Sequence, residues 1–299
     1  MKSKKKIALL GGDLRQYAAA ERLSTGMWDI YMWGMDRTER GEVGIGFCES
    51  CEDAVGDAVG VILPLPASAD GSTLNCPFAS SDKQIRLNDL LVMLKPTTLL
   101  VGGRIPEPFF RNAEARGIRV RDYFVSEEFQ IENAYTTAEA AISIAMNSLN
   151  RNLRGARVAI TGYGRIAKHL IRLLSVLGAE VTVAARKESD LAWARSLGCE
   201  TLMLRASETV TDLSKGYDII YNTVPHWLFD RSFLERMSGD TFLIDLASVP
   251  GGVDICAAKE LGSNVLWATS LPGKYAPLSA GYLIADCVDR ILREEVVGE

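Results

Sequence analysis

Residues Arg157–Gly178 have the sequence RVAITGYGRIAKHLIRLLSVLG. The apolar run at the start of this stretch is rich in β-branched residues and predicts a buried strand. The amphipathic sequence at its end predicts a helix. Between them lies a G-x-G-x-x-A turn, in which Gly162 permits the tight turn, Gly164 lets the backbone approach a pyrophosphate, and Ala167 keeps helix and strand close. The helix N-terminus then faces the anion. The turn also contains Tyr163, Arg165 and Ile166. We therefore predict a nicotinamide dinucleotide site; the alternative is glycines that serve only close packing.

The second strand of this half indicates which dinucleotide is bound. NAD sites usually carry Asp or Glu about 20 residues after the first glycine, to bond the ribose 2′-hydroxyl. This chain has AARK at 184–187 instead. Arg186 can bind a 2′-phosphate bidentately, with help from Lys187 or Ser189. We therefore predict NADP rather than NAD, unless Arg186 only stacks on the adenine or is solvated.

Polar residues follow the later strands of the same half, where open parallel sheets bind their ligands. The strand 217–222 ends in the cofactor-binding candidates Asn222, Thr223, Val224 and Pro225, and Ser248 follows the strand 241–245. We name three catalytic candidates, His226, Lys274 and Tyr275. His226 suits a general acid, but a histidine at a strand end is more often structural. Lys274 and Tyr275 follow a Pro-Gly turn and suit substrate binding or proton transfer, unless they are solvated loop residues.

The N-terminal half repeats the alternation of short strands and amphipathic helices, with five strands expected. A helix of small apolar residues is expected from about Thr137 to Leu149, capped at Thr136-Thr137. The fold class is thus α/β, with two Rossmann-like, doubly wound parallel-sheet domains joined by inter-domain helices. We expect a substrate-side domain at 1–135, the inter-domain helix at 136–150 and the cofactor domain at 151–280. A C-terminal helix at 281–299 is expected to pack on the N-terminal domain.

Four residues at strand ends of the first domain are candidates for substrate binding. Arg15 and Gln16 lie in the opening turn of a helix, Ser68 follows the third strand, and Arg104 follows Gly102-Gly103. We expect them to position the substrate beside the cofactor domain. Two arginines on neighbouring loops suit a dicarboxylate, because guanidinium and carboxylate pair bidentately. Each arginine would otherwise form a surface ion pair.

Composition indicates which classes of binding partner to expect. The chain has 299 residues, and its formal charge of −5 argues against nucleic-acid binding, which needs a basic surface. The first apolar run is too short for a signal peptide, and none is long enough to span a membrane, so we expect a cytosolic protein. Cys48 and Cys51 form a C-x-x-C pair, but no second ligand pair accompanies it. We therefore expect free thiols and no metal.

The chain resembles the family of the dipicolinate synthase A subunit over nearly its full length. The resemblance rests on GGDLRQ at 11–16, VILPLP at 61–66, TAEAAI at 137–142, TGYGRIAKHL at 161–170, NTVP at 222–225 and SLPGKYAP at 270–277. It implies a dehydrogenase-like subunit that oxidises dihydrodipicolinate to dipicolinate, pyridine-2,6-dicarboxylate. It also implies a partner, the flavoprotein-like B subunit of the synthase, and a location in the mother-cell cytoplasm of a sporulating bacterium.

Three further points stay open at this stage. The two-domain layout also fits a 2-hydroxy-acid or amino-acid dehydrogenase, although such enzymes usually need a catalytic histidine or lysine and none stands out. A cofactor-binding regulatory subunit without turnover is the alternative from another class. Association into a homo-oligomer is compatible with either.

Overall fold

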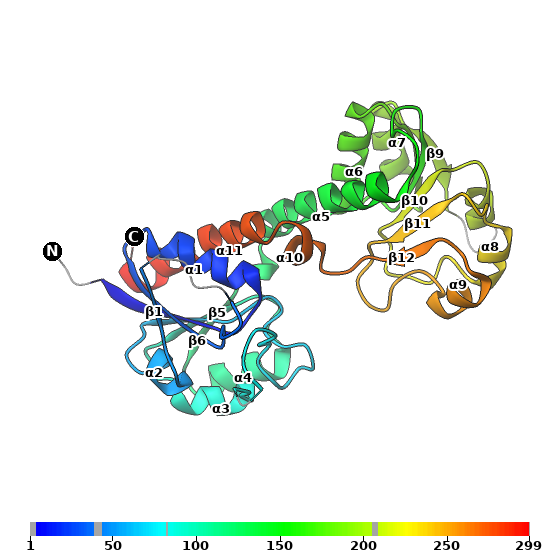
Figure 1. Cartoon of the computed structure of the whole chain (residues 1–299). Helices are drawn as coiled ribbons and strands as arrows, with labels where there is room; N and C mark the ends of the chain where they lie inside the picture. The colour runs from blue at the N-terminus through cyan, green and yellow to red at the C-terminus, as the bar shows by residue number, and fades with distance from the viewer. Residues whose placement is uncertain (1–3, 39–43, 82, 205–208, 299) are drawn as a thin grey trace. The chain divides into compact units, whose positions relative to one another are not determined.

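The computed structural model describes residues 4–38, 44–81, 83–204 and 209–298. The chain divides into two compact units, Met1–Asn133 with Ala276–Glu299, and Ala134–Tyr275. Within the described residues, each unit contains one six-stranded parallel sheet flanked by helices (Figure 1). The predicted α/β fold class, with two Rossmann-like sheets, is confirmed.

The sheet of the N-terminal unit has the strand order β3-β2-β1-β4-β5-β6. Its strands are β1 (Lys5–Leu10), β2 (Trp28–Trp33), β3 (Ile45–Phe47), β4 (Gly60–Ile62), β5 (Leu99–Gly102) and β6 (Arg119–Asp122). Its helices are α1 (Leu14–Ser24), α2 (Cys51–Val55), α3 (Leu87–Met93), α4 (Glu107–Ala115) and α11 (Pro277–Leu292), with short turns η1 (Tyr123–Val125) and η3 (Arg293–Val297).

Side chains of β1 alternate between two cores, as the period of a strand requires. Ile7 and Leu9 pack with α1 and α11 on one face, whereas Ala8 and Leu10 pack with α3 and α4 on the other. The contact between α1 and α11 is close. A Cβ at Gly281 would lie 2.5 Å from the backbone oxygen of Arg15, so this helix pair needs glycine there.

The sheet of the second unit has the order β12-β11-β10-β7-β8-β9. Its strands are β7 (Arg157–Thr161), β8 (Glu180–Ala185), β9 (Glu200–Met203), β10 (Ile219–Asn222), β11 (Phe242–Asp245) and β12 (Val265–Trp267). Its helices are α6 (Arg165–Val176), α7 (Glu188–Ser196), α8 (Arg231–Arg236), α9 (Ile255–Leu261) and α10 (Leu271–Tyr275), with the turn η2 (Thr209–Ser214). Helix α5 (Glu127–Ser148) begins in the first unit and ends in the second.

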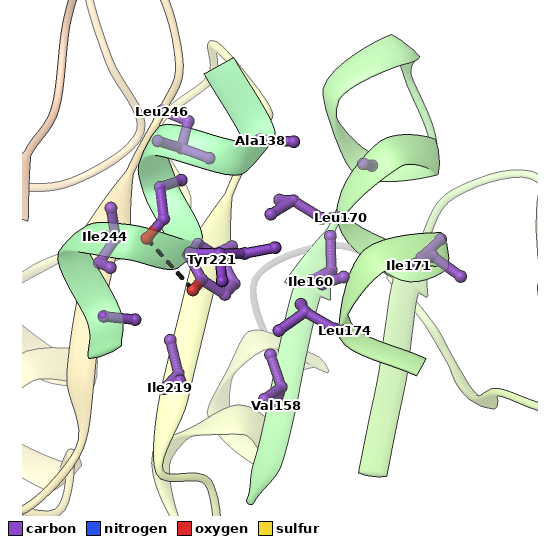
Figure 2. Packing of buried hydrophobic residues seen from close by; sticks show 14 of the residues in the cluster. Ala138, Val158, Ile160, Leu170, Ile171, Leu174, Ile219, Tyr221, Ile244 and Leu246 are labelled. Carbon is purple, nitrogen blue, oxygen red and sulfur yellow. Dashed lines mark hydrogen bonds between the residues drawn. The ribbon is translucent and has the colours of Figure 1, made fainter. Parts of the chain in front are cut away.

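The small residues of α5 allow this helix to lie directly on the second sheet. Figure 2 shows Ala138 above side chains of β7, β10 and β11, with α6 alongside. The hydroxyl of Tyr221 donates a hydrogen bond to the backbone oxygen of Ala141 at 3.4 Å (Figure 2). Burial of each large aliphatic side chain in this cluster contributes about 1.5–3 kcal/mol. The AEAAISIAM sequence is therefore explained by close packing.

The order of the strands fixes where a ligand can lie. In each sheet the chain proceeds outward from a central strand, first to one side and then to the other: from β1 in the first unit and from β7 in the second. Loops that leave the carboxyl ends of β7 and β10 therefore diverge, and open α/β sheets bind ligands in such places. The register pairs Thr161 with Asn222 at this edge.

Several local predictions were wrong. Helix α5 begins at Glu127, not at Thr137, and Thr137 is buried within it. The upstream residues are good helix formers, and the Ser126 hydroxyl accepts a hydrogen bond from the backbone N–H of Phe129. The edge strands β3 and β9 were not predicted, because runs of three or four residues show little periodicity. No described helix is long and apolar enough to cross a membrane.

Candidate functional site

The turn between β7 and α6 requires glycine at position 162. Gly162 has φ +89°, and its N–H donates to the backbone oxygen of Ala184 at 2.8 Å. A Cβ at this position would lie 2.7 Å from Thr223 Oγ1 and 3.1 Å from Val224 Cγ2. Any side chain would therefore strain the backbone and displace the loop that follows β10.

At Gly164, neither the backbone angles nor packing within the protein requires glycine. Gly164 caps α6 with φ −81° and ψ −168°, which other residues adopt, and a Cβ would meet nothing within 4 Å. No side chain forms a capping hydrogen bond at the start of α6. Ala167, one turn on, is fully buried against the sheet. The geometry fits a pyrophosphate, which needs backbone donors and room for close approach.

A pocket of about 800 Å³ opens beside the glycine turn. Its walls come from the glycine turn, the end of β8, the loop after β10 and helix α8. Six predicted residues line it: Gly162, Tyr163, Arg186, Lys187, Val224 and His226. Ten further lining residues are Ala185, Asp190, Leu204, Val210, Trp227, Leu228, Asp230, Ser232, Phe233 and Arg236. The pocket thus has both apolar walls and cations, as a nucleotide needs.

Cations lie at the carboxyl end of β8. Arg186 and Lys187 are both exposed, and no described residue forms a hydrogen bond or ion pair with the Arg186 side chain. Across the pocket, α8 contributes Arg236. Burial raises the pKa of Tyr163, and the nearby Cys199 and Asp190 raise it further, so its phenol is neutral and can donate a hydrogen bond. The Asp230 carboxylate accepts from the backbone N–H of Phe233 at 2.8 Å.

Asn222, a predicted cofactor-binding residue, lies inside the protein. Its side chain is wholly buried, and both amide atoms form hydrogen bonds with protein groups. The Thr223 hydroxyl also points inward, donating to the backbone oxygen of Thr161 at 2.7 Å. Pro225 is exposed in the same loop. Of these predicted residues, Val224 is the one that reaches the pocket.

The remaining predicted residues of the second unit are scattered. His226 is exposed and lines the nucleotide-sized pocket. Lys274 and Tyr275 are exposed outside that pocket, and they lie in helix α10 rather than in the predicted loop. Two more exposed residues do not line the pocket: Ser189, in the first turn of α7, and Ser248, after β11. The structure therefore does not gather the three catalytic candidates around that pocket.

Three of the four predicted substrate residues are engaged within the first unit. The Arg15 guanidinium pairs with the Asp13 carboxylate at 2.7 Å and also donates to the backbone oxygen of Leu65. Gln16 is 1% exposed and donates to the backbone oxygen of Ile62. Ser68 Oγ donates within its own loop, to the backbone oxygen of Thr73 at 2.6 Å. The pairing of Arg15 with Asp13, two residues earlier, corresponds to the ion-pair alternative for this arginine.

Arg104 is the exception. It is exposed, with the left-handed φ of +53° that only a few per cent of non-glycine residues adopt. The Asp122 carboxylate accepts the backbone N–H groups of Arg104 and Ile105, at 3.1 and 2.8 Å. The guanidinium lies 5.7 Å from the Phe124 ring centre, and no described carboxylate pairs with it. A backbone held in a strained conformation therefore presents an unpaired cation.

The C-x-x-C pair has the properties of structural cysteines. All six cysteines are free thiols, and Cys51 is buried at the start of α2. Burial raises the pKa of Cys51 to about 12 and also raises that of Cys48. Both thiols are thus protonated at neutral pH and poorly nucleophilic. Among the described residues, no group of three or more His, Cys, Asp or Glu could hold a metal ion.

Comparisons with known proteins agree with this architecture. Residues 6–124 match the family described as the N-terminal domain of the dipicolinate synthase A subunit. Residues 127–249 match the D-isomer specific 2-hydroxyacid dehydrogenase NAD binding domain. The A subunit of dipicolinate synthase from Bacillus subtilis is 29% identical, over 97% of this chain and 96% of that protein.

Solved structures give the same result. The crystal structure of the dipicolinate synthase A chain from Bacillus subtilis has a TM-score of 0.84 and 28% identity, covering 100% of this chain and 99% of that chain. The A subunit from Bacillus halodurans has a TM-score of 0.83 and 26% identity, covering 98% and 99%. The D-lactate dehydrogenase of Escherichia coli, at 15% identity and TM-score 0.63 with 98% of both chains covered, shares the fold.

Fold and site together define a dehydrogenase-like protein with an NAD(P)-binding Rossmann unit, in the general class of nicotinamide-dependent oxidoreductases. Within that class, the predicted resemblance to the dipicolinate synthase A subunit is confirmed along almost the whole chain. Residues 6–124 match the model of the N-terminal domain of that subunit.

Proposed function

We propose that the protein carries out the NADP-dependent oxidation of dihydrodipicolinate to dipicolinate, together with a second, flavoprotein-like subunit. The observation that carries the proposal is the similarity to the A subunit of dipicolinate synthase over 97% of the chain. An open glycine turn beside a pocket with cations supports it. The same relation favours a role in the mother-cell cytoplasm during sporulation.

The cofactor would be held by the second unit. Backbone N–H groups at Gly164 and the start of α6 suit the pyrophosphate, and Arg186 with Lys187 suits a 2′-phosphate. Trp227, an exposed pocket residue, supplies apolar surface for the adenine. The nicotinamide, when bound, supplies the hydride acceptor.

The substrate would be recognised through its carboxylates, for which Arg104, an exposed cation of the first unit, is the candidate. Removal of one hydride and one proton from the dihydropyridine ring gives an aromatic product, which makes the reaction favourable. Positioning of the ring then supplies much of the catalysis. His226, Lys274 and Tyr275 stay candidates for the group that accepts the proton.

An assay of the purified protein tests this function. With dihydrodipicolinate and NADP⁺, we expect absorbance from NADPH to appear, and to appear faster when the flavoprotein-like partner is added. NAD⁺ should support a lower rate. Turnover only with a 2-hydroxy acid or an amino acid would contradict the proposal. It would favour the alternative of a 2-hydroxy-acid or amino-acid dehydrogenase, and residues 127–249 match the NAD-binding domain of the 2-hydroxy-acid enzymes. Cofactor binding without turnover in any mixture would indicate a regulatory subunit.

Replacing Arg104 with alanine is expected to raise the KM for the dicarboxylate about 10- to 100-fold, as loss of one charge-assisted pair does. The KM for NADP⁺ should change less than twofold. Arg111→Ala is the matched control, because Arg111 is an exposed arginine of the same unit whose one ion pair with a described residue is to Glu107 on its own helix. An unchanged substrate KM in Arg104→Ala would remove Arg104 from the substrate site.

A further inference from the structure

Three polar side chains form a buried row across the second sheet. Thr161 ends β7, Asn222 ends β10 and Asp245 ends β11, and the strand register pairs the first with the second and the second with the third. All three are 0% exposed. Burial of an amide and a carboxyl group is unfavourable unless hydrogen bonds replace those lost from water.

Hydrogen bonds join the row from end to end. Thr161 Oγ1 donates to Asn222 Oδ1 at 2.6 Å, and Asn222 Nδ2 donates to Asp245 Oδ1 at 2.7 Å. The order of donor and acceptor is therefore fixed: a hydroxyl donates to an amide, and the amide donates to a carboxyl oxygen.

The same side chains also hold two loops. Asn222 Oδ1 accepts the N–H of Val224, and Asn222 Nδ2 donates to the Val224 backbone oxygen, both at 3.1 Å. Asp245 Oδ1 accepts the N–H of Ala247 at 3.0 Å, and Oδ2 accepts that of Gly252 at 2.8 Å. The loops after β10 and β11 are thus fixed to one set of side chains.

Close packing connects this row to the glycine turn. A Cβ at Gly252 would lie 2.3 Å from Asn222 Nδ2 and 2.9 Å from the Val224 backbone oxygen. On its other side, Val224 Cγ2 lies 3.1 Å from where a Cβ of Gly162 would be. A displacement of Asp245 would therefore shift Val224, which lines the pocket and packs against Gly162 of the glycine turn.

We propose that Asp245 is a positioning residue for the dinucleotide, acting through Asn222 on Val224 and the glycine turn. Three groups facing its carboxyl oxygens, the Asn222 amide and two backbone N–H groups, are all donors. An asparagine at 245 would point its own N–H groups at one of these donors. The proposal rests on the cofactor role of this unit and is independent of the substrate and of the choice between NADP and NAD.

Two isosteric variants test the proposal: Asp245→Asn and the milder Thr161→Val. Fluorescence titration with NADPH and NADH gives dissociation constants without turnover, and circular dichroism follows folding. We expect roughly tenfold weaker binding of the preferred dinucleotide in Asp245→Asn and roughly fivefold in Thr161→Val, the effect of one neutral hydrogen bond. Thr182→Val is the control, because Thr182 is a buried threonine on β8 of the same sheet, outside the row.

The double variant Thr161→Val/Asp245→Asn separates positioning from general destabilisation. If the row acts as one unit, the double variant should bind no more weakly than Asp245→Asn. Dissociation constants within twofold of wild type in both single variants, or an equal loss in Thr182→Val, overturn the proposal. If Asp245→Asn fails to fold, Thr161→Val against Thr182→Val decides. Failure of the wild-type chain to bind either dinucleotide would instead overturn the cofactor role.

Discussion

Replacing Arg186 with aspartate is expected to reverse the cofactor preference, weakening NADPH at least 100-fold while NADH binds equally well or more tightly. Arg186 follows β8 and lines the pocket beside Gly162. A guanidinium pairs bidentately with a phosphate, so its loss costs about 1.5–3 kcal/mol, and a carboxylate in its place repels the 2′-phosphate. Since 1.4 kcal/mol is a factor of ten, the two effects together give the expected loss.

Titration of wild type and Arg186→Asp with both dinucleotides measures this reversal. Arg172→Asp makes the same change in charge on the same unit, on an exposed position of α6 outside the pocket. The Arg172→Asp variant should keep the dissociation constants of NADPH and NADH within twofold of the wild-type values. That result would exclude a general effect of net charge. Equal or tighter binding of NADH by the wild-type protein would contradict the NADP assignment. In that case Arg186 would serve as an adenine-stacking or solvated side chain.

The sequence predicted the cofactor unit well because its signal is local. Gly162 and Gly164 lie between a strand and a helix that each show their own periodicity, and the backbone angles follow from the residues themselves. Arg186 was found by counting along the second strand. Parallel register then places the ends of β7, β8 and β10 at one edge without further information.

The rest of the site depends on contacts that a sequence does not display. Trp227 and Phe233 line the pocket, but only the fold of the loop and of α8 brings them there. The available signal for a pocket residue in the sequence was an aromatic side chain, Trp227, soon after the end of strand β10. Asn222 looked like a ligand contact because polar residues at strand ends often bind ligands. Its partner Asp245 lies 23 residues later, so the buried hydrogen bond could not be predicted.

Replacing Gly164 with valine is expected to abolish detectable dinucleotide binding while leaving the fold intact. The backbone at Gly164 has φ −81° and ψ −168°, which valine adopts readily, and a Cβ would meet no protein atom within 4 Å. The added side chain would instead occupy the space in which the pyrophosphate approaches the N-terminus of α6. Fluorescence titration should show at least a 100-fold weaker dissociation constant, with a melting temperature close to that of wild type.

Gly239→Val is the matched control for this experiment. Gly239 is exposed in the same unit, and a Cβ there also meets nothing within 4 Å. This variant should bind the dinucleotide normally. Gly162→Ala should differ from Gly164→Val in its effect on stability, because the φ of +89° at Gly162 and the 2.7 Å approach of a Cβ to Thr223 Oγ1 destabilise the folded state. We expect a lower melting temperature together with weaker binding. If Gly164→Val bound the dinucleotide as wild type does, the pyrophosphate would have to lie elsewhere, and Gly162 would serve close packing alone.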